Sequence, residues 1–93
     1  MEMETKYQLS PRIRYRDVMG EGVIVNLDTG RIVVINEVGL AIVGLLKESP
    51  MSQSSIVAKV VEEFDTTVDD ARPDIANFVE ELALENIIGA VTD

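Results

Sequence analysis

The most informative segment of this 93-residue chain reads Gly30-Arg31-Ile32-Val33-Val34-Ile35-Asn36-Glu37-Val38-Gly39. Four consecutive apolar residues follow a turn glycine and an arginine, which predicts a β-strand that is apolar on both faces. Asn36 is a favourable N-cap, so this strand should run directly into a helix. An outer strand of a small sheet has one unpaired edge. An apolar outer strand in so small a chain indicates that the strand has a partner.

The residues before this segment predict the rest of a small antiparallel sheet. Residues 12–16 alternate arginine with Ile13 and Tyr15, a pattern typical of a half-buried strand. Residues 23–27 form a second strand, and a tight turn at Gly30 makes it the antiparallel neighbour of residues 31–35. We expect residues 1–8 to be a flexible N-terminal tail, which leaves residues 9–93 as a single domain.

Three helices are predicted after the sheet. The first covers residues 37–48, where apolar residues recur at helical spacing, and a second follows it. The third begins at about Asp70 or Arg72, because Pro73 fits only the first turn of a helix. Residues 87–91 are expected to be a short extended tail. A three-stranded antiparallel sheet followed by three helices is an α+β fold, similar to winged helix-turn-helix proteins.

Composition argues against catalysis and against a membrane span. The chain has no Cys and no His, so thiolate chemistry, the commonest general base and the commonest metal ligand are missing. Adjacent carboxylates such as Glu80 and Glu81 point about 100° apart on a helix and do not form a dyad. We therefore expect no enzyme activity, no metal and no cofactor. No apolar run is long enough to span a membrane and no signal peptide is visible, so a cytoplasmic protein is expected.

The charge distribution disfavours nucleic acid as the partner. The net charge is −9, and residues 32–93 carry 12 of the 17 acidic residues but only 3 of the 8 basic ones. A winged-helix DNA-binding regulator would need a basic recognition helix, whereas the third helix carries mainly acidic residues. Arg12, Arg14 and Arg16 are read as the solvent face of a strand. An acidic surface favours a basic peptide or protein instead.

An extended peptide fits the apolar strand best. Such a peptide would add to the free edge of residues 31–35 by main-chain hydrogen bonds, while its alternate side chains enter apolar pockets. Ile32 and Val34 would face one way, and Val33 and Ile35 the other. The residues alone do not decide which pair faces the peptide-binding groove. A second copy of the chain, in a weak homodimer, is an alternative occupant of the same edge.

Two motifs in a fixed order resemble those of the PqqD-like peptide-recognition domains. The motifs are Gly22-Val23-Ile24-Val25-Asn26-Leu27-Asp28-Thr29-Gly30-Arg31 and Ile35-Asn36-Glu37-Val38-Gly39. Later residues agree with the same family, namely Ile56, Phe64, Asp74-Ile75, Phe78-Val79, Leu82 and Asn86-Ile87-Ile88. The resemblance covers residues 12–91 and is strongest to the stand-alone recognition proteins of lasso-peptide pathways. The chain departs from that subgroup at Ile32 and Val33, where aromatic residues are frequent, and at Val43, where Trp is frequent.

The resemblance implies a function. Such domains are non-catalytic adaptors that bind the leader segment of a ribosomally synthesised precursor peptide (RiPP) and deliver it to a leader peptidase or another maturation enzyme. An alternative within the family is the presentation of a precursor to a radical enzyme in quinone-cofactor synthesis. Carried over to this chain, the resemblance implies a peptide-binding site made of Arg31, Ile32, Val33, Val34, Ile35, Asp74, Ile75, Phe78, Val79, Glu81 and Leu82. Asp74 and Glu81 would meet basic residues of the leader.

Overall fold

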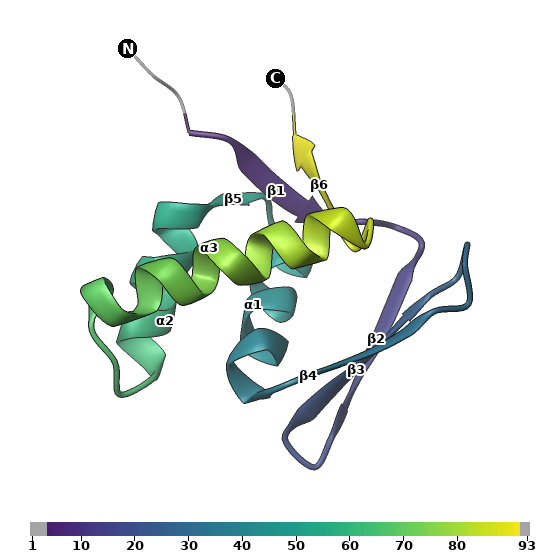
Figure 1. Cartoon of the computed structure of the whole chain (residues 1–93), viewed down its shortest axis with the longest axis horizontal. Helices are drawn as coiled ribbons and strands as arrows, with labels where there is room; N and C mark the ends of the chain where they lie inside the picture. The colour runs from purple at the N-terminus through teal and green to yellow at the C-terminus, as the bar shows by residue number, and fades with distance from the viewer. Residues whose placement is uncertain (1–3, 92–93) are drawn as a thin grey trace.

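The computed structural model describes residues 4–91, which form antiparallel sheets and three helices (Figure 1). The elements are β1 Lys6–Leu9, β2 Ile13–Val18, β3 Glu21–Asn26, β4 Ile32–Ile35, α1 Glu37–Glu48, β5 Met51–Ser52, α2 Gln53–Glu63, α3 Val68–Leu84 and β6 Ile88–Val91. The predicted α+β class is confirmed, as is the order of the β2–β4 strands and the three helices. No helix in this part of the chain is long and apolar enough to cross a membrane.

The larger sheet is the predicted meander, in the order β2-β3-β4. Gly30 has φ = +76°, as the tight turn between β3 and β4 requires. The side chain of Asn36 accepts a hydrogen bond from the Gly39 N–H at 2.9 Å, so the predicted helix cap is present at the end of β4. The helices cover one face of this sheet, where Ile13, Ile24 and Ile35 join the core.

A second sheet, in the order β5-β1-β6, joins the two ends of the described chain. Lys6 lies opposite Val91, and Leu9 lies opposite Ile88. The expectation of a flexible tail over residues 1–8 is therefore wrong for residues 6–8, which pair with β5 and β6; residues 1–3 lie outside the described part. The extended segment at residues 87–91 was predicted, but its pairing with β1 was not.

Helix α3 begins earlier than Pro73 suggested. The Thr67 side chain accepts a hydrogen bond from the Asp70 N–H at 3.2 Å, which caps the helix at Val68. Asp69 and Asp70 then occupy the first turn, where the helix dipole favours negative charge. Pro73 therefore lies inside the helix instead of in its first turn. The favourable capping at Thr67 is the physical reason that the helix extends past the proline on its N-terminal side.

The core position of β4 depends on a glycine in the neighbouring strand. Gly22 lies opposite Ile35 in the register of β3 and β4. A Cβ atom at Gly22 would lie 2.6 Å from Cγ1 of Ile35 and 3.2 Å from Cδ1 of Leu40. Both distances are shorter than ordinary carbon contacts, so no side chain fits between β3 and α1 at this point.

We expect Gly22→Ala to lower the free energy of unfolding by about 1–3 kcal/mol, the usual cost of overpacking a core. Urea titration followed by circular dichroism measures this change. Gly89→Ala is the matched control, because Gly89 also lies in a strand and has no heavy atom within 4 Å of the added Cβ. Equal stability of the two variants would contradict the close approach of Ile35 to β3.

Candidate functional site

The free edge of β4 offers the hydrogen-bonding groups of two residues. The Asn26 N–H donates to the Arg31 carbonyl at 3.0 Å, which identifies this pair as hydrogen-bonded across β3 and β4. Hydrogen-bonded and non-bonded pairs alternate along an antiparallel ladder. Because Val33 lies opposite Ile24 and Ile35 opposite Gly22, these two residues bond β3. The N–H and C=O groups of Ile32 and Val34 therefore point away from β3, and no strand of residues 4–91 pairs with them.

The side chains of β4 divide between the two faces of the sheet. Ile35 is 7 % exposed and packs in the core, and Val33 is half-buried on the same side. Ile32 and Val34 are 63 % and 61 % exposed and point to the outer face. Val33 and Ile35 are thus the pair that faces the helices. Ile32 and Val34 also line a groove between β4 and α3. They contribute to it with the edge of the strand, while their side chains point away from the helices.

A groove lies between β4 and the C-terminal half of α3. Its volume is about 490 Å³, which is large enough for several side chains of an extended peptide. The strand contributes residues 31–36 to its lining. The helix contributes two apolar and two acidic residues, namely Phe78, Glu81, Leu84 and Glu85. An unpaired strand edge next to a groove with apolar side chains is the arrangement required for β-strand addition.

A second hollow continues from this groove along α3 towards the start of α1. It has a volume of about 350 Å³ and shares Asn36, Phe78 and Glu81 with the first. The Phe78 ring lies between the two hollows and packs on a glycine of α1. A Cβ atom at Gly39 would lie 2.9 Å from Cζ of Phe78. Gly39 thus allows α3 to pack closely against α1. Together the two hollows, here called the α3 groove, form one continuous surface beside β4.

The α3 groove has an acidic wall. Glu81 lines both hollows, Asp74 lines the second and Glu85 the first. Arg31 Nε pairs with a carboxylate oxygen of Glu85 at 2.8 Å, across the end of the groove where β4 begins. No ion pair within the described residues engages Asp74 or Glu81. Their negative charge is therefore available to a basic side chain of a bound peptide.

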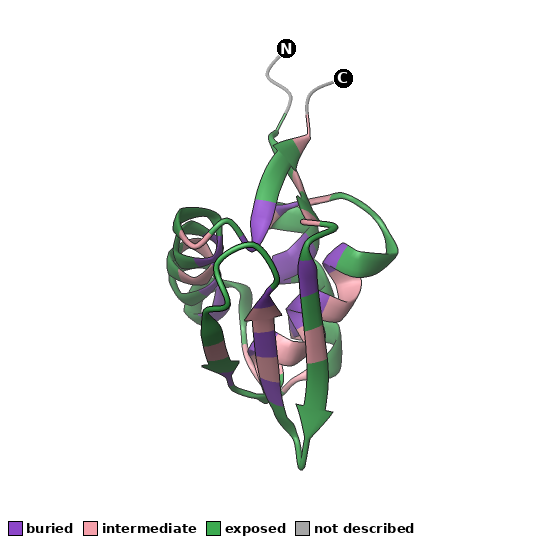
Figure 2. Cartoon of the chain, turned by 90° about the vertical axis from the view of Figure 1, so that its right-hand side faces the viewer, coloured by how far each residue is buried: buried purple, intermediate pink, exposed green. Residues whose placement is uncertain are grey.

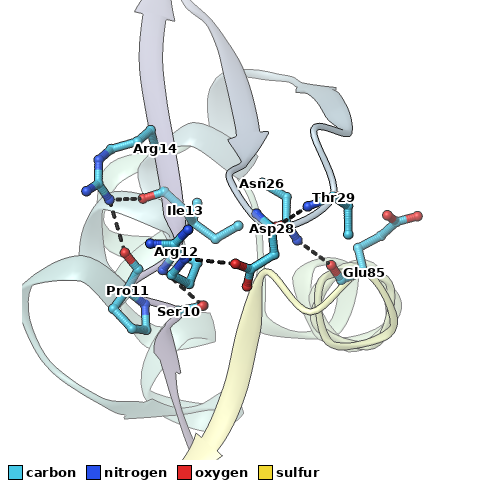
Figure 3. A network of polar contacts seen from close by, with 9 residues as sticks. All are labelled: Ser10, Pro11, Arg12, Ile13, Arg14, Asn26, Asp28, Thr29 and Glu85. Carbon is cyan, nitrogen blue, oxygen red and sulfur yellow. Dashed lines mark hydrogen bonds and ion pairs between the residues drawn. The ribbon is translucent and has the colours of Figure 1, made fainter.

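A network of polar contacts holds the β3–β4 turn against the end of α3 (Figure 3). The buried amide oxygen of Asn26 accepts hydrogen bonds from the backbone N–H groups of Asp28 and Thr29. Its amide nitrogen donates to the Glu85 carbonyl at 3.4 Å. Arg12, just before β2, forms an ion pair with Asp28, just after β3, at 2.8 Å. The hydrogen bond from Asn26 to Glu85 joins the end of β3 to the C-terminal end of α3, beside the groove.

The predicted site residues divide into those that line the α3 groove and those that lie in the core. The α3 groove is lined by Arg31, Ile32, Val33, Val34, Ile35, Asp74, Ile75, Phe78 and Glu81. Ile75 is largely buried and contributes only to the floor of the second hollow. Val79 and Leu82 are 1 % and 2 % exposed, lie in the core and line neither hollow, because they occupy the side of α3 that faces the other helices.

Sequence reasoning missed Leu84 and Glu85 in the lining of the groove. Both continue the helical face that starts at Phe78 and Glu81, since residues three or four apart on a helix are neighbours. This spacing could have identified them once Phe78 and Glu81 were chosen. Asn36 was predicted as a cap only, yet it also lines both hollows.

Comparisons with known proteins agree on the fold. The profile of the family described as "Coenzyme PQQ synthesis protein D (PqqD)" matches residues 21–88. A solved structure described as "TbiB1 in Complex with the TbiA(beta) Leader Peptide" is 23 % identical, with a TM-score of 0.79 over 92 % of this chain and 99 % of that one. Another, "Lasso peptide synthetase B1 complexed with the leader peptide", is 24 % identical, with a TM-score of 0.71 over 92 % and 98 %. No curated protein sequence matches the chain significantly.

Proposed function

The chain belongs to the PqqD family, and we propose that it is a non-catalytic adaptor for a ribosomally synthesised precursor peptide of the lasso-peptide type. The leader segment of the precursor adds as a strand to β4 and packs side chains into the α3 groove. The adaptor then delivers the bound precursor to a leader peptidase. Two structures with the same fold are described as complexes with leader peptides, which supports this choice of ligand.

The observation that carries the proposal is the unpaired edge of β4 beside the α3 groove. The backbone groups of Ile32 and Val34 supply two donors and two acceptors for a peptide strand. Peptide side chains on the inner side then reach Phe78 and Leu84, while the acidic wall of the groove receives Lys or Arg. Backbone pairing supplies affinity that is independent of sequence, and the groove supplies specificity.

The direct test is the binding of a fluorescein-labelled leader peptide from the precursor encoded beside this chain, measured by fluorescence anisotropy. We expect saturable binding with a Kd in the micromolar range or below, and no saturation with a scrambled peptide of equal charge. Equal affinity for the two peptides would contradict the proposed function. Sedimentation of the free protein tests the competing occupant, because a homodimer through β4 would dissociate when the leader is added.

A second candidate is the presentation of a precursor to a radical enzyme in quinone-cofactor synthesis, which the family match itself favours. It uses the same edge and groove, so the structure of the site does not separate the two functions. The genes next to this one do, since they encode either a leader peptidase with a cyclase or a radical enzyme.

We expect Glu81→Lys to weaken the binding of a leader that carries Lys or Arg by about three- to tenfold, because the change replaces an attraction of about 0.5 kcal/mol by a repulsion of similar size. Glu80→Lys is the matched control, since Glu80 is the neighbouring exposed glutamate and lines neither hollow. Titrations at low and high salt should converge for wild type and Glu81→Lys. Identical Kd values for the two variants would show that the acidic wall does not contribute to peptide binding.

A further inference from the structure

The outer face of the β2-β3-β4 sheet is not covered by any element of residues 4–91 (Figure 2). Strand alternation places Ile13, Ile24 and Ile35 towards the helices, so the residues between them point outwards. The outer face carries five aliphatic side chains, each exposed or half-exposed: Val18, Val23, Val25, Ile32 and Val34. We call this set, with Arg14 and Arg16, the outer patch.

The outer patch carries a net positive charge, unlike the molecule as a whole. Glu21 lies opposite Val18 and points to the same face, so the two arginines leave this face with one positive charge in excess. Arg14 lies opposite Val25 and Arg16 opposite Val23, so each arginine begins a row of side chains that ends on β4. Arg14 donates only to neutral carbonyls, those of Pro11 and Ile13 at 3.0 Å. No ion pair within residues 4–91 engages Arg14 or Arg16. A cationic, apolar surface therefore lies on a chain whose net charge is −9.

The hollow at the β2 side of the outer patch has a volume of about 400 Å³. It is lined by both arginines, Tyr15 and three valines, namely Val18, Val23 and Val25. This hollow lies on the opposite face of the sheet from the α3 groove, and the hydrogen bonds offered by β4 point sideways from the sheet. A peptide strand at β4 therefore leaves the hollow open. The two surfaces can be occupied at the same time.

We infer that the outer patch docks the processing enzyme that receives the bound precursor, through an apolar contact surface with an acidic rim. The inference rests on the proposed function, because an adaptor needs one surface for the peptide and a separate one for the enzyme. Charge complementarity selects the partner: the net charge of −9 repels an acidic protein, whereas Arg14 and Arg16 beside the apolar side chains attract one. The strands β2, β3 and β4 have six, six and four residues, and such a sheet covers on the order of 250 Å². This area is less than the ~800 Å² per partner of a stable interface and indicates a transient contact.

The test couples two measurements on the same variants. Arg14→Glu/Arg16→Glu reverses the charge of the outer patch, and Lys59→Glu/Arg72→Glu is the matched control with the same change in net charge on α2 and α3. Each protein is titrated with the labelled leader peptide. Each is then added to the leader peptidase of the same pathway with the full precursor, and the adaptor concentration for half-maximal cleavage is determined.

We expect Arg14→Glu/Arg16→Glu to bind the leader as wild type does but to require about tenfold more adaptor for half-maximal cleavage, while the control stays within about twofold. Val25→Thr, which keeps a β-branched residue in β3, should raise the requirement in the same direction. Unchanged cleavage by Arg14→Glu/Arg16→Glu overturns the inference and leaves the proposed function intact. Failure of the wild type to bind the leader overturns the proposed function instead. A wild-type dimer that Arg14→Glu/Arg16→Glu dissociates would assign the patch to a second copy and also overturn the inference.

Discussion

Val34→Pro should raise the Kd for the leader peptide by at least about thirtyfold while the protein stays folded. The Val34 N–H points to the free edge of β4, so proline removes a donor that the peptide needs and not one that β3 uses. The lost hydrogen bond and the peptide carbonyl left without a partner together cost about 2–3 kcal/mol, and each 1.4 kcal/mol is a factor of ten in Kd. Fluorescence anisotropy with the labelled leader measures the effect.

Val34→Thr is the control for this result. Threonine keeps the backbone N–H and the branched shape of the exposed side chain, so leader binding should change by less than about threefold. The far-ultraviolet circular dichroism and the unfolding midpoint of Val34→Pro should stay close to those of wild type, because edge strands tolerate proline where the N–H faces solvent. A folded Val34→Pro protein with unchanged affinity would mean that the leader does not pair with β4.

Local chemistry made β4 and its surroundings predictable from sequence. Gly30 supplies the positive φ of the turn, and Asn36 caps α1 with its side chain. Each of these features depends on a few neighbouring residues, which is why the turn, the strand and the helix over residues 37–48 were predicted correctly. The early start of α3 was not predicted, because Pro73 by itself indicates a helix start close to it, whereas the cap at Thr67 and the two aspartates after it stabilise a start five residues earlier.

The second sheet could not be predicted because its pairing joins the opposite ends of the chain. Lys6 lies opposite Val91 on one side and Ser52 on the other. Strand β5 contains only two residues, which is too short for a periodic pattern. Local sequence patterns therefore predict a tail over residues 1–8 and a short extended tail packed against the helices over residues 87–91, but not the pairing between them.

The candidate site also depends on tertiary contacts that local sequence patterns do not predict. Ile75, Phe78, Val79 and Leu82 form one apolar stripe at helical spacing in the sequence, but the packing of the helix divides them. Val79 and Leu82 face the other helices, whereas Phe78 stands at the border of the core and faces β4. Which side chains of α3 face the core and which face β4 depends on how the helix lies across the domain. It is fixed by tertiary contacts such as the bond from Asn26 to the Glu85 carbonyl, which no helical spacing reveals.

Phe78→Ala should weaken leader binding by about tenfold or more, because the Phe78 ring lines both hollows of the α3 groove. Truncation removes apolar surface that the peptide would cover, and a large part of an aromatic contact is worth about 1.5–3 kcal/mol. The ring also packs on Gly39, so its loss leaves a gap between α1 and α3 into which the groove can relax. Both effects change the α3 groove into which the peptide places its side chains.

Phe64→Ala separates loss of binding from loss of stability. Phe64 is the other phenylalanine of the chain, and it is also partly buried against the core, but it lies at the end of α2 and lines neither hollow. Both variants should unfold at lower urea concentration than wild type, since each loses a ring packed on the core. Only Phe78→Ala should lose affinity in anisotropy titrations of the folded protein. If the two variants bound the leader equally well, the peptide would contact β4 without entering the α3 groove, and specificity would have to come from the exposed side chains of Ile32 and Val34.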